Sequence, residues 1–321
     1  MRLSSLIGAA VMAAAIAPTV HAQTESSIGT AETAARRAAL AARIDSGVVI
    51  AFGGRALVHD FSTFYQLPAF RYLTELNEPD AALVMVVRNK IPQSTLFLTP
   101  LDARTAFYYG QRVDSLTSLS RYGMAGRSFA ALGGVLDSLA AVGLPFYHIP
   151  DVETTDFARN DTLTRGQEAF KALVAKHPTL PIRNGMPHVL QVRAKKSAAE
   201  LALIRKAAEI SAEGHRAAML TANPMHEYEL RAALEYEFTR RGAERPAYGS
   251  IVGAGINGTT LHYMKDGDPV RPGDLVVMDA AAEFRGYAAD ITRTIPVSGT
   301  YTREQRQLYQ LVRDAQDAAE R

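Results

Sequence analysis

The sequence contains no cysteine, and its 321 residues carry a formal net charge of only +2. Without cysteine the chain cannot form disulfides, bind a metal through thiolates or use a cysteine nucleophile. The small net charge and the lack of a dense Lys/Arg tract argue against a nucleic-acid partner. Motifs for a nucleophile elbow, a P-loop or a His-Glu-x-x-His zinc site are also missing. The length and the apolar fraction of 47% are those of a globular enzyme of about two domains.

The first 22 residues have the pattern of a secretion signal. Arg2 supplies a positive charge, residues 6–17 form an apolar stretch, and a small-x-Ala cleavage site ends at Ala22. A transmembrane anchor is the alternative, but the apolar stretch is short and Pro18 interrupts it. We therefore expect residues 1–22 to be removed, no stable membrane anchor, and export of the mature chain to a bacterial periplasm or the medium.

Apolar runs alternate with helical patterns through the first part of the mature chain. This alternation predicts an α/β domain with a mostly parallel or mixed sheet, extending over residues 23–194. The expected strands are 48–52, 82–87, 95–98 and 146–149, and the expected helices are 34–44, 128–141 and 164–175.

A second domain should begin at residue 195. Ser197 and Glu200 form a capping box that starts a long helix. Its apolar positions at helical spacing include Leu201, Ile204 and Ala208. A further helix at 226–241 should turn one apolar face inward and end near Gly242. That face consists of Leu230, Leu234 and Phe238.

Two aspartates, Asp279 and Asp290, flank a turn candidate at Arg285-Gly286 between two β-rich runs. A two-residue turn would place Phe284 opposite Tyr287, Ala281 opposite Asp290 and Asp279 opposite Thr292. Both aspartates would then share one face of a hairpin, roughly 7–8 Å apart at the backbone. Such a pair can converge on a cation, although two solvated surface acids are an alternative. The apolar flanks favour the cation, because partly buried carboxylates need neutralisation.

The segment around these aspartates resembles the first metal-ligand segment of the pita-bread metallopeptidases, which include methionine aminopeptidase, aminopeptidase P and prolidase. The likeness lies in Asp279, Glu283 and the run Asp290-Ile-Thr-Arg-Thr, with Ala281 where a glycine is usual. The resemblance implies that Asp279 and Asp290 are metal ligands.

Upstream, the run from Ala247 to Tyr263 resembles the superfamily segment that brings a substrate-binding histidine to the same site. By this resemblance His262 would hydrogen-bond the scissile peptide or stabilise the tetrahedral intermediate. Its neighbours at 259–263 predict a strand. A structural or surface histidine is the alternative, and His215 and His226, on helices without partners at ligand spacing, receive that interpretation.

A Gly-x-Gly-x-x-Gly pattern at 253–258 is followed about twenty residues later by Asp279. A dinucleotide site needs its last glycine to open a helix. Gly258 instead leads towards a Gly/Pro turn, so we expect no nucleotide cofactor.

The first domain also carries a resemblance. Residues 70–84, with their Tyr-Leu-Thr and Glu-Pro-Asp runs, are similar to a signature of the aminopeptidase P N-terminal domain. Within it, Asn77, Glu78 and Asp80 are expected to serve packing and turns. The implied fold is an α/β N-terminal domain of the creatinase/aminopeptidase P kind, followed by the first half of an α+β pita-bread catalytic domain. Relatives use the N-terminal domain for oligomer contacts, so a homo-oligomer is expected.

The resemblance further implies a Xaa-Pro aminopeptidase, which releases the N-terminal residue of peptides that have proline in second position. Two divalent metal ions, manganese in many relatives, would be held by two aspartates, one histidine and two glutamates. The last three would follow residue 321, so the chain, with residues 195–321 as a partial catalytic domain, is expected to be an inactive fragment. The final helix, from Arg303, should turn Leu308, Val312 and Ala315 inward. Alternatives are a prolidase, a creatinase-like hydrolase or a non-catalytic binding module.

Overall fold

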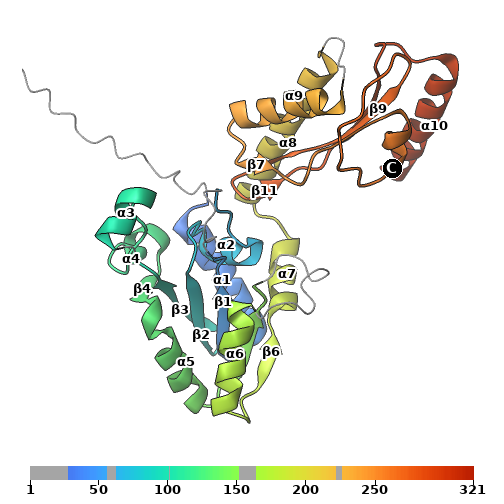
Figure 1. Ribbon diagram of the computed structural model, residues 1–321. Coiled ribbons are helices and arrows are strands. Elements are labelled where there is room, and N and C mark those ends of the chain that lie inside the picture. The colour runs from blue at the N-terminus through green and yellow to red at the C-terminus, as the bar shows by residue number, and fades with distance from the viewer. Residues whose placement is uncertain (1–27, 56–62, 101, 152–163, 222–225) are drawn as a thin grey trace, which may run out of the picture.

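The computed structural model describes residues 28–55, 63–100, 102–151, 164–221 and 226–321. The expected secretion signal therefore lies outside the described residues. Two bodies follow each other along the chain, and the long helix α8 (Ala198–Met219) begins the second (Figure 1). In the described ranges no helix is long and apolar enough to cross a membrane.

A six-stranded mixed sheet forms the centre of the first body, in the order β4-β3-β2-β1-β5-β6. Its strands are β1 (Gly47–Phe52), β2 (Ala82–Arg88), β3 (Ile91–Leu98), β4 (Ala125–Ser128), β5 (Phe146–Ile149) and β6 (Ile182–Asn184). The strand β1 pairs antiparallel with β2 and parallel with β5, and all its residues are buried. The mixed sheet predicted from the sequence is confirmed.

Helices cover both faces of this sheet, which explains why β1 is apolar at every position. One face packs against α1 (Thr30–Ile44), α2 (Pro68–Thr74) and α7 (Met186–Ala194), and the other against α5 (Leu132–Ala141) and α6 (Arg165–Lys176). Shorter elements are α3 (Ala103–Tyr109), α4 (Ser118–Tyr122) and the 3₁₀ turn η1 (Phe129–Ala131). The helix predicted at 128–141 begins only at Leu132, because Ser128 ends β4 and η1 intervenes.

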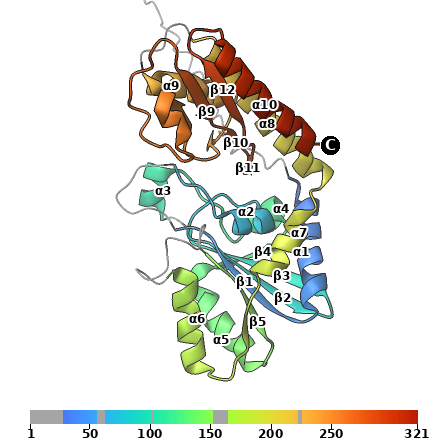
Figure 2. The ribbon, with the colours of Figure 1, turned by 90° about the vertical axis from the view of Figure 1, so that its right-hand side faces the viewer.

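The second body packs two helices on two small sheets, with orders β12-β9-β8 and β11-β10-β7. Its remaining elements are α9 (Glu227–Arg240), β7 (Arg245–Pro246), β8 (Ile251–Ala254), η2 (Gly255–Thr259), β9 (Leu275–Asp279), β10 (Ala282–Phe284), β11 (Tyr287–Ala288), β12 (Thr292–Pro296) and α10 (Arg303–Ala319). Figure 2 shows this body above the first, with β10 and β11 at the boundary.

The helices of the second body partly match their sequence patterns. The capping box of Ser197 and Glu200 is present at the start of α8, and α9 buries Leu230, Leu234 and Phe238. The apolar positions named in the sequence did not specify which stripe of α8 is buried. That stripe consists of Leu203, Ala207, Ile210, Gly214 and Ala218, whereas Leu201 is half exposed. An alanine-rich helix offers several apolar stripes of similar strength, and packing against α9 and β10 selects one of them.

The prediction that the last helix, α10, turns Leu308, Val312 and Ala315 inward is wrong for the described residues. Leu308 and Val312 of α10 are 59% and 63% exposed, and Ala315 is exposed as well. Gln305, in the first turn of α10, donates from its side chain to Gly273 O, in the turn before β9, at 3.0 Å. The amphipathic pattern predicted that this apolar face would pack against other apolar residues. None of the described elements packs against it.

Candidate functional site

A two-stranded ribbon carries the two aspartates. Its turn is Arg285-Gly286, both with left-handed φ values of 52° and 81°, as a two-residue hairpin turn of type I′ requires. The register pairs Phe284 with Tyr287 and Asp279 with Thr292, as predicted. The ladder is interrupted between these pairs, so the predicted pairing of Ala281 with Asp290 falls in a gap between the two sheets.

Side chains of α8 hold the ribbon where its ladder is interrupted. Ser211 Oγ accepts a hydrogen bond from Ala282 N at 2.8 Å, and His215 Nε2 lies 2.9 Å from Ala280 O. A carbonyl oxygen only accepts, so this nitrogen carries the proton. Burial lowers the pKa of His215, which keeps the ring neutral near neutral pH. His215 is thus a structural residue, as the sequence analysis interpreted it.

Tyr248 connects the two aspartates. Its hydroxyl oxygen lies 2.5 Å from Asp279 Oδ1 and 3.1 Å from Asp290 Oδ1, so both carboxylates converge on one atom. Burial, followed by the hydrogen bond to Asp279, raises the pKa of Tyr248. The phenol therefore stays protonated and donates its single proton to one carboxylate at a time.

A cavity of about 410 Å³ gathers all three residues singled out by the sequence. It is lined by Tyr248, Gly249, Ile251, His262, Met264, Asp279 and Asp290. Asp279 is partly buried, Asp290 is exposed, and His262 is exposed at the rim. The geometric expectation that the aspartates converge is therefore met, and their chemical role stays a prediction.

The segment that carries His262 was predicted as a strand and is not one. Residues 255–259 form η2, and Leu261 and His262 form a turn. Gly253 explains this path, because a side chain there would meet the Asn257 carbonyl carbon at 2.9 Å as the chain folds back. Gly258 lies within η2 and opens no α-helix, so the nucleotide-binding pattern lacks the helix it needs.

Two residues of this region were missed by the sequence analysis. Tyr248 lies three residues before β8, and its relation to the aspartates depends on the pairing of Ile251 with Asp279. Glu227, the first residue of α9, is fully buried and accepts hydrogen bonds from the loop that carries His262. An acid at the start of a helix is common, so no local signal distinguished it.

The polar residues of the first-domain signature make structural contacts. Asn77 Oδ1 accepts from Gln66 N at 3.2 Å, and the Glu78 carboxylate accepts from Val113 N at 2.9 Å. Burial raises the pKa of Glu78. Asp80 pairs with Arg165 at 2.8 Å. These contacts agree with the expected packing and turn roles.

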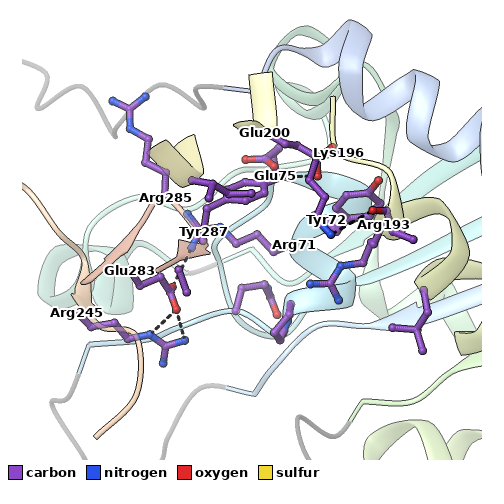
Figure 3. Close-up of a pocket in the computed structure, with 17 residues that line it drawn as sticks. Arg71, Tyr72, Glu75, Arg193, Lys196, Glu200, Arg245, Glu283, Arg285 and Tyr287 are labelled. Atoms are coloured by element: carbon purple, nitrogen blue, oxygen red, sulfur yellow. Dashed lines mark hydrogen bonds and ion pairs between the residues drawn. The ribbon is translucent and has the colours of Figure 1, made fainter. Parts of the chain in front are cut away.

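A second cavity, of about 530 Å³, lies where the two bodies meet, and we call it the boundary cavity (Figure 3). Two arginines of its lining form ion pairs. Arg71 binds both oxygens of Glu244 at 2.9 Å, and Arg245 binds Glu283 at 3.0 and 3.1 Å. The boundary cavity therefore lies within an ion-paired contact between the bodies, at the turn end of the ribbon.

Comparisons with known proteins match both bodies. Residues 33–141 match the aminopeptidase P N-terminal domain, and residues 202–321 match metallopeptidase family M24. The chain is 36% identical over 265 residues to a Xaa-Pro aminopeptidase of Haemophilus influenzae, covering 80% of this chain and 57% of the relative. It is 34% identical over 247 residues to a Xaa-Pro aminopeptidase of Escherichia coli, covering 76% of this chain and 56% of the relative.

Solved structures agree. Proline aminopeptidase P II from Yersinia pestis superposes with a TM-score of 0.80 at 32% identity, over 90% of this chain and 68% of that one. Aminopeptidase P from Escherichia coli with the inhibitor Pro-Leu superposes with a TM-score of 0.80 at 30% identity, over 91% of this chain and 67% of that one. The α/β domain and the ribbon-and-helix unit thus correspond, in order, to the two domains of an M24 metallopeptidase. The chain belongs to the aminopeptidase P family.

The predicted fold class is thereby confirmed: an aminopeptidase P type N-terminal domain precedes part of a pita-bread domain. The chain spans a little more than half the length of the curated relatives it matches.

Proposed function

We propose that the complete protein is a metal-dependent exopeptidase that releases the N-terminal residue from peptides with proline in second position. The observation that carries this proposal is the convergence of Asp279, Asp290 and His262 on one cavity in a chain of this family. The named activity of the relatives supports the substrate class. The proposal concerns the complete protein, because this chain covers 57% and 56% of those relatives.

The two aspartates suit a divalent metal ion. Neither pairs with a Lys or Arg side chain in the described part of the chain, although their oxygens converge on one hydroxyl. Two converging carboxylates, one of them partly buried and neither paired with a cation in the described residues, are a donor set that a hard divalent ion can neutralise. We infer two such ions in the complete site, and manganese fits the oxygen ligands. The described residues hold no group of three or more potential ligands. From the family resemblance we propose that one histidine and two glutamates of the complete protein supply the remaining ligands.

Bound metal ions would lower the pKa of an attacking water and polarise the scissile carbonyl. This chain's residues would fix the geometry. Tyr248 donates to an aspartate and so restricts the orientation of both carboxylates, as residues behind a metal ligand do. His262, at the cavity rim, would donate a hydrogen bond to the peptide or to the developing oxyanion.

We further propose export of the mature chain after removal of residues 1–22, and a homo-oligomer built through the N-terminal domain. Both rest on sequence patterns and resemblance. Sequencing the N-terminus of the isolated protein and measuring its mass in solution would test them.

The activity is tested with the complete protein, Mn²⁺ and peptides with or without proline in second position. Asp290→Ala should lose both proline-specific release and Mn²⁺ binding measured by calorimetry. Asp314→Ala, which removes an exposed acid of α10, should retain both. Retained release by Asp290→Ala would contradict the metal assignment. Cleavage of dipeptides alone would identify a prolidase. A wild-type protein that neither binds Mn²⁺ nor changes on Asp279→Ala would be a binding module.

A further inference from the structure

The carboxylate of Glu227 lies beneath the loop that carries His262. Glu227 is 0% exposed, and both of its oxygens are surrounded by donors. Oε1 accepts from Ala254 N at 2.8 Å and Asn257 Nδ2 at 2.9 Å, and Oε2 accepts from Tyr263 hydroxyl at 2.9 Å and Asp268 N at 3.1 Å.

These donors are distributed over the whole loop, residues 255–268. Ala254 precedes it, Asn257 lies in η2, Tyr263 follows His262 directly, and Asp268 ends it. The Glu227 backbone N–H also donates to Asp268 O at 3.1 Å. A single residue at the start of α9 therefore contacts the loop at both ends and in the middle, where regular strand pairing is missing.

The four donors require a carboxylate. Each oxygen accepts two hydrogen bonds, and a carboxylate has no donor of its own. Glutamine has nearly the same shape, but its NH₂ group would face either Ala254 N or Asp268 N, and that backbone N–H would lose its acceptor in either orientation of the amide. Burial, with Glu227 beside it, raises the pKa of Tyr263 to about 12, so its hydroxyl remains a donor at neutral pH.

We infer that Glu227 is a positioning residue, which places His262 at the cavity of Asp279 and Asp290 by fixing the loop 255–268. The catalytic consequence rests on the proposed function, because it assumes that His262 acts on the substrate. The dependence of the loop on Glu227 does not rest on it.

The test compares Glu227→Gln with Glu235→Gln in the complete protein. Glu235 is on the same helix, and among the described residues its carboxylate has a distant ion pair with Arg231, at 3.8 Å. Hydrogen exchange should become about tenfold faster at 254–268 in Glu227→Gln alone, because opening of the loop then breaks fewer of these hydrogen bonds. The kcat/KM for a Xaa-Pro peptide should fall about tenfold to a hundredfold, with Mn²⁺ affinity unchanged.

A second comparison separates positioning from general damage. In a His262→Ala background, Glu227→Gln should lower kcat/KM no further, because both changes remove the same contribution. Tyr263→Phe removes one donor and should give a smaller increase in hydrogen exchange at 254–268. This variant provides the test if Glu227→Gln folds poorly. Unchanged exchange in both variants would overturn the inference, and so would an equal loss of activity with and without His262. A wild-type protein without Xaa-Pro activity would refute the proposed function, while the exchange result would still decide the role of Glu227.

Discussion

Tyr287 joins the turn end of the ribbon to the first body, and its hydroxyl is a sensitive point of that contact. It accepts a hydrogen bond from Arg36 Nη2 at 3.0 Å and donates one to Glu200 Oε1 at 3.0 Å. Arg36 and Glu200 are each 3% exposed. Tyr287→Phe would remove both bonds without changing the shape of the ring.

The expected loss follows from the charge of both partners. A hydrogen bond to a charged group contributes about 1.5–3 kcal/mol. Arg36 retains its bond to Tyr72 O at 3.0 Å, and Glu200 retains Ser197 N at 2.9 Å. The two charges are also only 3.8 Å apart and can approach each other once the hydroxyl is gone. We therefore expect a net loss of about 2 kcal/mol, which lowers Tm by roughly 3 °C for a chain of 321 residues.

Scanning calorimetry of the wild type and two variants measures this effect. Tyr236→Phe is the matched control, because that ring is 65% exposed on α9 and its change should move Tm by about 1 °C or less. Equal Tm values for Tyr287→Phe and Tyr236→Phe would refute the reasoning. They would show that the contact between the bodies does not depend on this hydroxyl.

Two further predictions concern single positions. Burial lowers the pKa of His148 from 6.5, so below that pH the unfolded chain binds more protons and stability should fall as the pH decreases. His148→Phe keeps a ring beside Phe170 and should reduce the fall in Tm between about pH 7.5 and 5.5. If Tm falls with pH as steeply in this variant as in the wild type, His148 is not the group responsible. Gly253→Ala should destabilise by about 1–3 kcal/mol, because its methyl group meets the Asn257 backbone at 2.9 Å. Gly133→Ala, in open space on α5, should not lower Tm, and equal Tm changes would show that the loop at Gly253 yields freely.

The register of the ribbon could be predicted on both sides of its gap, because two local constraints fix it. A two-residue turn aligns the strands, and the alternation of a strand then assigns every side chain to a face. Arg285 and Gly286 adopt the left-handed conformations that this turn needs. The sequence therefore predicted the convergence of Asp279 and Asp290, without any knowledge of what surrounds them.

Other features could not be predicted because they depend on packing partners. The apolar pattern at 259–263 predicted a strand, but Asn257 and Tyr263 instead satisfy Glu227, 30 and 36 residues earlier. A buried carboxylate that needs four donors outweighs a weak strand preference. The face of α8 that is buried was likewise determined by packing against α9 and β10.

The residues proposed for chemistry and those that place them thus come from different parts of the sequence. Asp279 is the last paired residue of β9, Asp290 lies in the gap of the ribbon, and His262 lies in a turn. The polar groups that replace this pairing come from the buried faces of α8 and α9, through Ser211 and Glu227. Because these contacts are buried, their loss is not compensated by water. Substitutions on these two helices should therefore disturb the cavity as strongly as substitutions at its rim.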